Sequence, residues 1–367
     1  MSRFLSAAIL LGILSATPVS AWDRGEVDVL AVLPDVTPGV PSRVEGLTVG
    51  PDDNIYVPSF GFNFQGALTG NAVLYVIKPS GALVRKVTIQ NSSPHLLGLA
   101  FNPVNNFLLV LDFGAGKVLH VDPVMGTSSV FAVPPVGGSG LNALTFDKQG
   151  NVYISDSFNG VIWKTGPTGG TLTAWSSHPL LQPGNGVNGP GTVLTPPFGA
   201  NGVEFNNAGT ILFVANTATR QIIQIPVNPD GTAGQASIFI TGINAPDGIA
   251  IDRKDNLWVC ANQEDDIIVL DKTGKVIAKL GDFNGINDGV VEGFLFPASP
   301  AFSRDGKTLY VSNLTLFLPF AGANAAVDSA WTLKARHYTV AKIRAVIPPF
   351  GQQNDQGQQN DQGENQQ

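Results

Sequence analysis

A motif that recurs six times constrains the fold of this chain more than any other feature. Its clearest copy is APDGIAIDRKDNLWVCA, residues 245–261, in which two short apolar runs flank a polar turn. Apolar runs of this length around a turn rich in Asp, Asn and Lys are typical of a tight antiparallel hairpin. We therefore expect strands at residues 249–252 and 257–261.

Five further copies align on the last apolar residue of the first strand. They read EGLTVGPDDNIYV, LGLAFNPVNNFLLV, NALTFDKQGNVYI, NGVEFNNAGTILFV and ASPAFSRDGKTLYV. The alignment positions lie 45 to 59 residues apart and are Val49, Phe101, Phe146, Phe205, Ile251 and Phe302. All-strand units with a period of roughly 40 to 50 residues are typical of propeller blades. The sequence predicts an all-β, six-bladed β-propeller of four-stranded antiparallel blades.

The two ends of the predicted propeller should share one blade. Residues 27–33 form an apolar strand pattern before the first copy, and residues 338–346 alternate as a strand after the last one. Pairing of these segments would close the ring and remove the exposed sheet edges. The predicted propeller domain spans residues 22–350.

Composition excludes one class of partner, and the N-terminal segment indicates an exported protein. The 367 residues include 42 Gly and 26 Pro and carry a formal net charge of −7, which argues against binding to nucleic acid. Residues 1–21 combine one positive charge, an apolar run and a small-residue cleavage site, as in a secretory signal peptide; a membrane anchor is the alternative. We expect a secreted or periplasmic monomer without stable membrane insertion. The Gln- and Asn-rich residues 351–367 are predicted to be disordered.

The single cysteine, Cys260, lies in the apolar run NLWVCA. One cysteine gives the chain no internal disulfide. We expect Cys260 to be a buried apolar side chain, with no reactive role.

Oxygen-bearing side chains recur four residues before the alignment position. The six residues at that position are Glu45, Leu97, Asn142, Asn201, Asp247 and Ala298. Equivalent positions in a propeller form a ring about its axis, so Glu45, Asn142, Asn201 and Asp247 should converge. Two carboxylates and two amide oxygens suit a hard divalent cation. Calcium is the expected ion, with magnesium, manganese or zinc as alternatives. These residues could also satisfy strand ends around a water-filled channel.

Other polar and aromatic residues accompany this ring. Segments 59–71, 168–198 and 313–337 interrupt the regular spacing, as functional loops often do. Five aromatic residues in the first and third of them would form an apolar roof or pack on one another: Phe60, Phe62, Phe64, Phe317 and Phe320. A set at the end of the second strand would cap strands or support the ring: Ser59, Asp112, Asp156, Asn216 and Asn313, with Asn262 one place off register.

The units VEGLTV, LNALTF, ANGVEF and PDGIAIDRKDNLWV, in this order, resemble those of the gluconolactonase, regucalcin and luciferin-regenerating enzyme family of six-bladed propellers. Strictosidine synthase-like and NHL-repeat propellers are more distant in appearance. The resemblance covers residues 44–313. In that family a Glu, two Asn and an Asp bind one divalent cation, which implies the metal ligands Glu45, Asn142, Asn201 and Asp247. The family's Asp is also the proposed base, which implies a catalytic role for Asp247.

The sequence departs from the family pattern at two positions. Gly140 stands where the family has an Arg that contacts sugar hydroxyls, and Ala143 stands where an Asp usually follows the first Asn. The resemblance implies a metal-dependent hydrolase of small-molecule lactones or related esters. In it the cation would polarise the carbonyl and lower the pKa of a water, while Asp247 accepts the proton.

Two other functions stay open. The departures at Gly140 and Ala143 favour a non-catalytic propeller that binds a ligand or a protein partner and uses the cation as a structural element. His95 lies two residues before the ring position of the second copy, and a neutral imidazole is a competent base near neutral pH. A His-assisted lactonase of paraoxonase type is therefore a further alternative.

Overall fold

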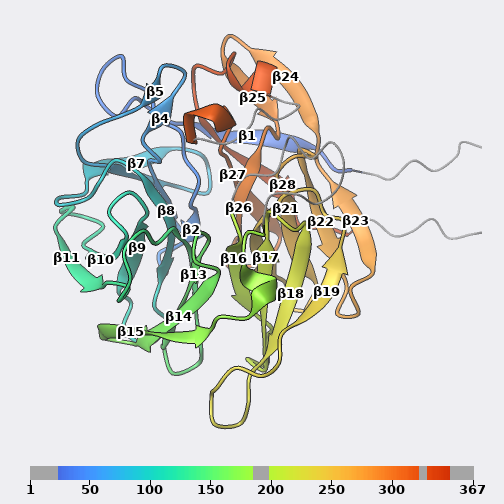
Figure 1. The fold of residues 1–367 in the computed structure, drawn as a ribbon. Helices are drawn as coiled ribbons and strands as arrows, with labels where there is room; N and C mark the ends of the chain where they lie inside the picture. The colour runs from blue at the N-terminus through green and yellow to red at the C-terminus, as the bar shows by residue number, and fades with distance from the viewer. Residues whose placement is uncertain (1–23, 185–197, 322–328, 348–367) are drawn as a thin grey trace, which may run out of the picture. The chain divides into compact units, whose positions relative to one another are not determined.

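The computed structural model describes residues 24–184, 198–321 and 329–347. Within these residues, six antiparallel sheets of four strands each form the blades of a propeller (Figure 1). The predicted all-β, six-bladed fold is confirmed. The predicted signal peptide at residues 1–21 and the predicted disordered tail at residues 351–367 lie outside the described residues.

Each of the first three blades is an up-and-down meander whose strands follow one another in the chain. Blade one contains β2 (Thr48–Val49), β3 (Ile55–Pro58), β6 (Val73–Ile77) and β7 (Leu83–Thr88). Blade two contains β8 (Leu96–Phe101), β9 (Leu108–Asp112), β10 (Lys117–Val121) and β11 (Ser128–Ala132). Blade three contains β12 (Leu141–Phe146), β13 (Val152–Asp156), β14 (Val161–Gly166) and β15 (Gly169–Ser176).

Blades four and five repeat this meander, and blade six joins the two ends of the propeller. Blade four contains β16 (Ala200–Phe205), β17 (Ile211–Asn216), β18 (Gln221–Pro226) and β19 (Ser237–Thr241). Blade five contains β20 (Pro246–Ile251), β21 (Leu257–Ala261), β22 (Asp266–Leu270) and β23 (Val276–Leu280). Blade six contains β26 (Pro297–Phe302), β27 (Thr308–Asn313), β28 (Thr339–Arg344) and β1 (Val27–Val32). Strand β1 pairs antiparallel with β28, which confirms the predicted closure.

The first strands of the six blades contact one another in a closed ring, in the order β2, β8, β12, β16, β20 and β26. Glycines allow this close approach of neighbouring backbones. A Cβ atom on Gly98 would lie 2.6 Å from the carbonyl oxygen of Asn142 in the next blade. Gly202 and Gly248 face the carbonyl oxygens of Asp247 and Ala298 in the same way. The ring is therefore as narrow as the backbone permits at these contacts.

Five of these first strands, all except β2, also carry an irregularity at the ring position. In blade three, Leu141 pairs with Asp156 but Leu144 pairs with Ile154, so one strand has an extra residue there. The same shift occurs in β8, β16, β20 and β26. Such bulges redirect a side chain out of the alternation of a regular strand.

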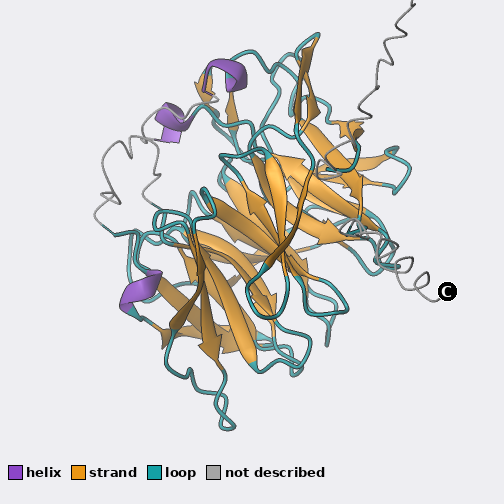
Figure 2. Cartoon of the chain, turned by 90° about the vertical axis from the view of Figure 1, so that its right-hand side faces the viewer, coloured by secondary structure: helices purple, strands orange, loops and turns teal. Residues whose placement is uncertain are grey.

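Several inserted elements among the described residues lie outside the blades. A short hairpin of β4 (Phe62–Asn63) and β5 (Gly66–Ala67) occupies the first predicted loop. The loop between β27 and β28 contains η2 (Leu318–Ala321) and α1 (Ser329–Thr332). A second hairpin, β24 (Phe283–Asn287) with β25 (Val290–Gly293), connects blades five and six and was not predicted. Among the described residues, the short helical segments all lie in connections outside the sheets (Figure 2).

The predicted interruption at residues 168–198 needs a correction. Its first part is β15, the fourth strand of blade three, because Gly169–Ser176 pairs with β14. The following residues form η1 (Pro179–Leu181), and residues 185–197 lie outside the described part of the chain. The high glycine content of the segment concealed a strand that begins with two glycines.

The core is distributed between neighbouring blades. One cluster joins Phe213 and Ile222 of blade four to Leu257 and Val259 of blade five. Cys260 belongs to another such cluster and is fully buried, as predicted. None of the helices in the described residues combines the length and the hydropathy that a membrane span requires.

Candidate active site

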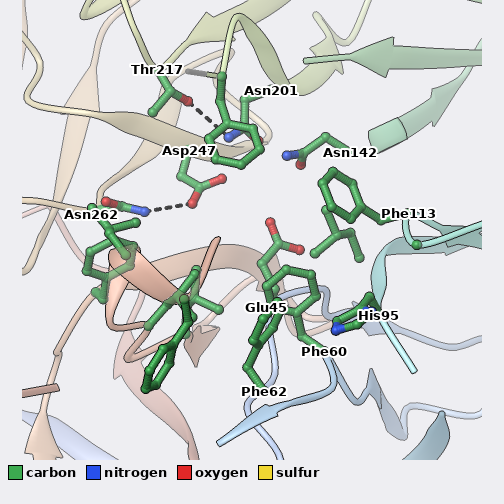
Figure 3. A pocket seen from close by; sticks show the side chains of 18 of the residues that line it. Glu45, Phe60, Phe62, His95, Phe113, Asn142, Asn201, Thr217, Asp247 and Asn262 are labelled. Atoms are coloured by element: carbon green, nitrogen blue, oxygen red, sulfur yellow. Dashed lines mark hydrogen bonds between the residues drawn. The ribbon is translucent and has the colours of Figure 1, made fainter. Parts of the chain in front are cut away.

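A cavity of about 310 Å³ lies at the end of the axis where the first strands begin. All four predicted ligands line it, namely Glu45, Asn142, Asn201 and Asp247. Figure 3 shows their side chains pointing toward a common space from different blades. The structure therefore brings together the oxygen donors that the repeat predicts to converge.

The strand bulges explain this orientation for three of the four residues. Asn142, Asn201 and Asp247 are each the first residue of the irregular segment in β12, β16 and β20. The extra residue turns their side chains toward the axis. The backbone of the bulge is satisfied locally, since Ser155 Oγ accepts a hydrogen bond from the Ala143 N–H at 2.9 Å.

The donor set has the free oxygens that a cation needs. Glu45 Oε2, Asn201 Oδ1 and Asp247 Oδ1 are buried and have no hydrogen-bond partner among the described residues. An unpaired buried polar atom costs about 1–3 kcal/mol, so three at one site indicate a missing partner. The described residues contain no cluster of three or more His, Cys, Asp and Glu side chains that could hold a metal. The ring does not form such a cluster because two of its four oxygen donors are amides. A hard cation with amide and water ligands fits it better than zinc.

The pKa values of the two carboxyl groups are also consistent with a cation site. Burial, and then the charge of Asp247, hold the pKa of Glu45 well above its usual range. Burial also raises the pKa of Asp247, although the hydrogen bond from Asn262 opposes this shift. A bound cation would allow both carboxylates to stay ionised, whereas without one at least one of them takes up a proton.

Two polar side chains orient the ring residues. Asn262 Nδ2 donates to Asp247 Oδ2 at 2.8 Å, and Asn201 Nδ2 donates to Thr217 Oγ1 at 3.0 Å (Figure 3). Thr217 Oγ1 in turn donates to the carbonyl oxygen of Pro246 at 2.8 Å. This bond links the ring residue of blade four to the residue before Asp247 in blade five.

Asn262 and Thr217 occupy equivalent positions, one residue after the second strand of their blades. The equivalent residues in the other blades are Phe60, Phe113, Ser157 and Leu314. All of these except Ser157 line the cavity. Sequence reasoning placed Asn262 off register and missed Thr217, because it aligned the second ring on the last strand residue. Alignment one residue later would have found both.

The polar residues predicted at the end of the second strands cap strands and do not support the ring. Asp156 accepts hydrogen bonds from the Gly140 N–H and from Trp163 Nε1, and Asn216 donates to the carbonyl oxygens of Leu180 and Gln182. The other three also hydrogen-bond the backbone: Ser59 and Asp112 accept from the N–H groups of Val73 and Ser93, and Asn313 donates to the carbonyl oxygen of Gly293. Within the described residues, none of the five lines the cavity, so they cap strands and tie loops to blades.

The predicted apolar roof is correct in part. Phe60, Phe62 and Phe320 line the cavity. Phe317 instead packs edge-on against Phe320 at 5.1 Å between ring centroids, and Phe64 lies under the guanidinium of Arg336. These last two rings support the loops rather than the cavity.

His95 faces the cavity beside the rings of Phe60 and Phe62. Its Nε2 atom is buried and has no partner among the described residues. Burial lowers the pKa of His95, and Asp112 opposes this shift. The imidazole is therefore neutral near pH 7. The other histidines do not line the cavity.

This fold and site define a class of protein: a six-bladed propeller with an axial pocket that presents two carboxylates and two amides. Comparisons with known proteins agree with the class. Residues 192–281, which contain Asn201 and Asp247, match the model of the SMP-30/Gluconolactonase/LRE-like region family. The resemblance seen in the sequence is confirmed.

The chain is also similar to a curated lactonase and to solved propeller structures. The chain is 27% identical over 145 residues to lactonase drp35 of Staphylococcus haemolyticus, a match that spans 38% of this chain and 41% of that protein. Its fold is similar to a gluconolactonase from Xanthomonas campestris, with a TM-score of 0.57, 13% identity and coverage of 87% and 90% of the two chains. It is also similar to the calcium-binding protein regucalcin from Agrobacterium tumefaciens, with a TM-score of 0.58, 18% identity and coverage of 87% and 92% of the two chains. At these identities the solved structures establish the fold alone.

Proposed function

We propose that this protein is a divalent-metal-dependent hydrolase of lactones or related esters, with calcium as the expected ion. One observation carries the proposal: Glu45, Asn201 and Asp247 each present a buried, unpaired oxygen to the same cavity. The names of the similar proteins, a lactonase, a gluconolactonase and a calcium-binding regucalcin, support it.

Glu45, Asn142, Asn201 and Asp247 would hold the cation. When bound, it supplies Lewis acidity for the carbonyl oxygen and stabilises the negative charge that develops during hydrolysis. The chain supplies the remaining functions. Asp247 accepts the proton of the attacking water, Asn262 orients the Asp247 carboxylate, and the Phe and Leu side chains of the wall exclude bulk water.

A first experiment separates metal binding from catalysis. Calcium binding to the mature protein is titrated by calorimetry, and hydrolysis of alkyl lactones and aryl esters is followed with calcium or with EDTA. We expect one calcium site and turnover that EDTA stops. If Asp247→Ala and Asn201→Ala both keep stoichiometric calcium, the ion lies elsewhere.

The Asp247→Asn variant tests the proposed base. An amide keeps one oxygen for the cation but cannot accept the proton, so kcat should fall about 100- to 10,000-fold. Calcium should still bind, with lower affinity. Calcium binding without hydrolysis of any lactone or ester would favour the alternative, a propeller that binds a ligand or partner around a structural cation.

Export to the periplasm or the medium is also part of the proposal. It rests on the pattern of residues 1–21. N-terminal sequencing of the mature protein would test it.

A further inference from the structure

We infer that the substrate is a lactone or ester that carries an alkyl or aryl group, and that the cavity discriminates against polyhydroxylated sugar lactones. This inference rests on the proposed function, whose substrate class it names. It follows from three features of the cavity: the chemistry of its wall, the contact between Gly140 and Phe158, and the number of polar groups that are free to bind a ligand.

The wall of the cavity is apolar apart from the ring residues, Asn262 and Thr217 that support them, and His95. Eleven of its lining residues are Phe or Leu. The apolar positions include Leu97 of the first ring and Phe60, Phe113 and Leu314 of the second. These residues come from blades six, one and two, whereas the polar residues of the second ring come from blades four and five. Phe158 and Phe198 extend the apolar wall to blades three and four, so the cavity offers an apolar surface for a hydrocarbon group beside the ring oxygens that would bind a carbonyl group through the cation.

Gly140 fixes part of this apolar wall. A Cβ atom on Gly140 would lie 2.7 Å from Cδ2 and 2.8 Å from Cγ of Phe158, so the Phe158 ring occupies the space of a side chain at position 140. The ring continues into an aromatic cluster. It stacks on Phe198 at 5.5 Å between centroids and meets Phe113 edge-on at 5.4 Å. No polar side chain at position 140 could reach the cavity without displacing Phe158.

The cavity lacks partners for several hydroxyl groups. Four of its polar side chains are the proposed cation ligands, and Asn262 and Thr217 already hydrogen-bond two of these. Among the described residues, His95 is the one polar lining side chain that remains. A sugar δ-lactone carries several hydroxyls, and each one buried without a partner weakens binding. An alkyl lactone carries none.

The size of the cavity limits the hydrocarbon group. Its volume of about 310 Å³ corresponds to about ten water molecules at roughly 30 Å³ each in the liquid. This space suits a lactone ring with a short alkyl or aryl substituent. A long acyl chain would extend out of the cavity.

Lactams test the inference independently of catalysis, because they keep the ring and the carbonyl group but are not hydrolysed. Binding of propyl-, butyl- and pentyl-substituted δ-lactams and of gluconolactam is measured by calorimetry on the full-length mature protein with calcium. We expect affinity to rise about fourfold with each added methylene, and gluconolactam to bind at least tenfold more weakly than the pentyl compound. Hydrolysis of δ-decanolactone and gluconolactone, compared by kcat/KM, should show the same order.

Two variants test whether Phe158 determines the preference for an alkyl group. Phe158 is 42% exposed, so Phe158→Ser should leave the fold intact. It should weaken binding of the pentyl lactam about tenfold and leave gluconolactam unchanged or improved. Phe107→Ser is the matched control, because Phe107 stacks on His120 in blade two and does not line the cavity. This control should bind both lactams as the unmodified protein does.

The outcomes separate the two proposals. Binding that is independent of alkyl length, or equal for the two kinds of lactam, would overturn the inference. Tight binding of the pentyl lactam without hydrolysis of any lactone would defeat the hydrolase and leave the ligand class standing.

Discussion

Asn262 Nδ2 donates a hydrogen bond to Asp247 Oδ2 at 2.8 Å, while Gln263 Nε2 donates to Asn262 Oδ1 at 2.8 Å. The second bond fixes which end of the Asn262 amide faces the carboxylate. Asp247 therefore keeps its other oxygen, Oδ1, free for the cavity. Asn262 is a positioning residue for the proposed base and ligand.

Replacement of Asn262 should weaken the metal site without removing a ligand. Asn262→Ala should lower calcium affinity about 10- to 100-fold, since groups that orient metal ligands contribute on this scale. It should also cost about 1–3 kcal/mol of stability because a buried carboxylate oxygen loses its donor. Calorimetric titration and thermal unfolding measure the two effects. Asn228→Ala, in an exposed turn of blade four, is the control. Unchanged affinity in Asn262→Ala would show that this bond does not organise the site.

Thr217 should act through its hydroxyl rather than its shape. Thr217→Val keeps the volume but removes the acceptor for Asn201 Nδ2 and the donor to the Pro246 carbonyl oxygen. We expect a loss of about 1–3 kcal/mol in stability and weaker calcium binding. Thr217→Ser restores the hydroxyl and should recover both properties in chemical denaturation and titration. A serine variant as impaired as the valine variant would assign the effect to packing of the methyl group.

The repeat made much of this fold predictable, because an alignment register converts sequence positions into positions around an axis. The strands of the hairpins, the closure by β1 and the convergence of Glu45, Asn142, Asn201 and Asp247 all follow from that register. The bulges did not follow from it. A signal was present in blades two, four and five, where Gly98, Gly202 and Gly248 follow the ring position, since a glycine within a strand indicates a bulge or a close backbone contact. Blades three and six have Ala143 and Ser299 there, so no such signal marked their bulges in the sequence.

The chemistry of the wall was less predictable. The absence of a side chain at Gly140 was visible in the sequence, but only coordinates show that Phe158 fills the space. These residues are 18 positions apart and meet through the pairing of β12 with β13. Likewise, no periodic pattern separates Phe320, which lines the cavity, from Phe317, which packs behind it.

Gly202 should be intolerant of any side chain. Its Cβ position coincides with the backbone of Asp247 in the next blade, and a backbone cannot move aside as a flexible side chain does. Gly202→Ala should therefore force blades four and five apart, at a cost of about 1–3 kcal/mol, and weaken calcium binding at Asn201 and Asp247 together. Thermal unfolding and titration measure this. The control is Gly166→Ala, where a Cβ atom meets nothing within 4 Å.

A second cavity, of about 390 Å³, lies at the opposite end of the first strands and contains Glu204. Thr145 Oγ1 donates to Glu204 Oε1 at 2.9 Å, and the Phe205 N–H donates to the same oxygen at 3.1 Å. Burial nevertheless raises the pKa of Glu204 to about 7 from its usual value of 4.5. The folded chain thus binds this proton more tightly than the unfolded chain does.

This shift predicts a pH dependence of stability. The contribution of protonated Glu204 is fully present below pH 4.5 and is lost as the pH rises through 7. Glu204→Gln mimics the protonated form and keeps an oxygen for Thr145. The variant should unfold at nearly the same temperature as the unmodified protein at pH 4.5, become the more stable of the two as the pH rises, and keep a constant advantage above pH 8. Glu292→Gln, at an exposed position in β25, controls for the loss of one negative charge. A temperature difference that does not change with pH would mean that Glu204 titrates alike in the folded and unfolded chains.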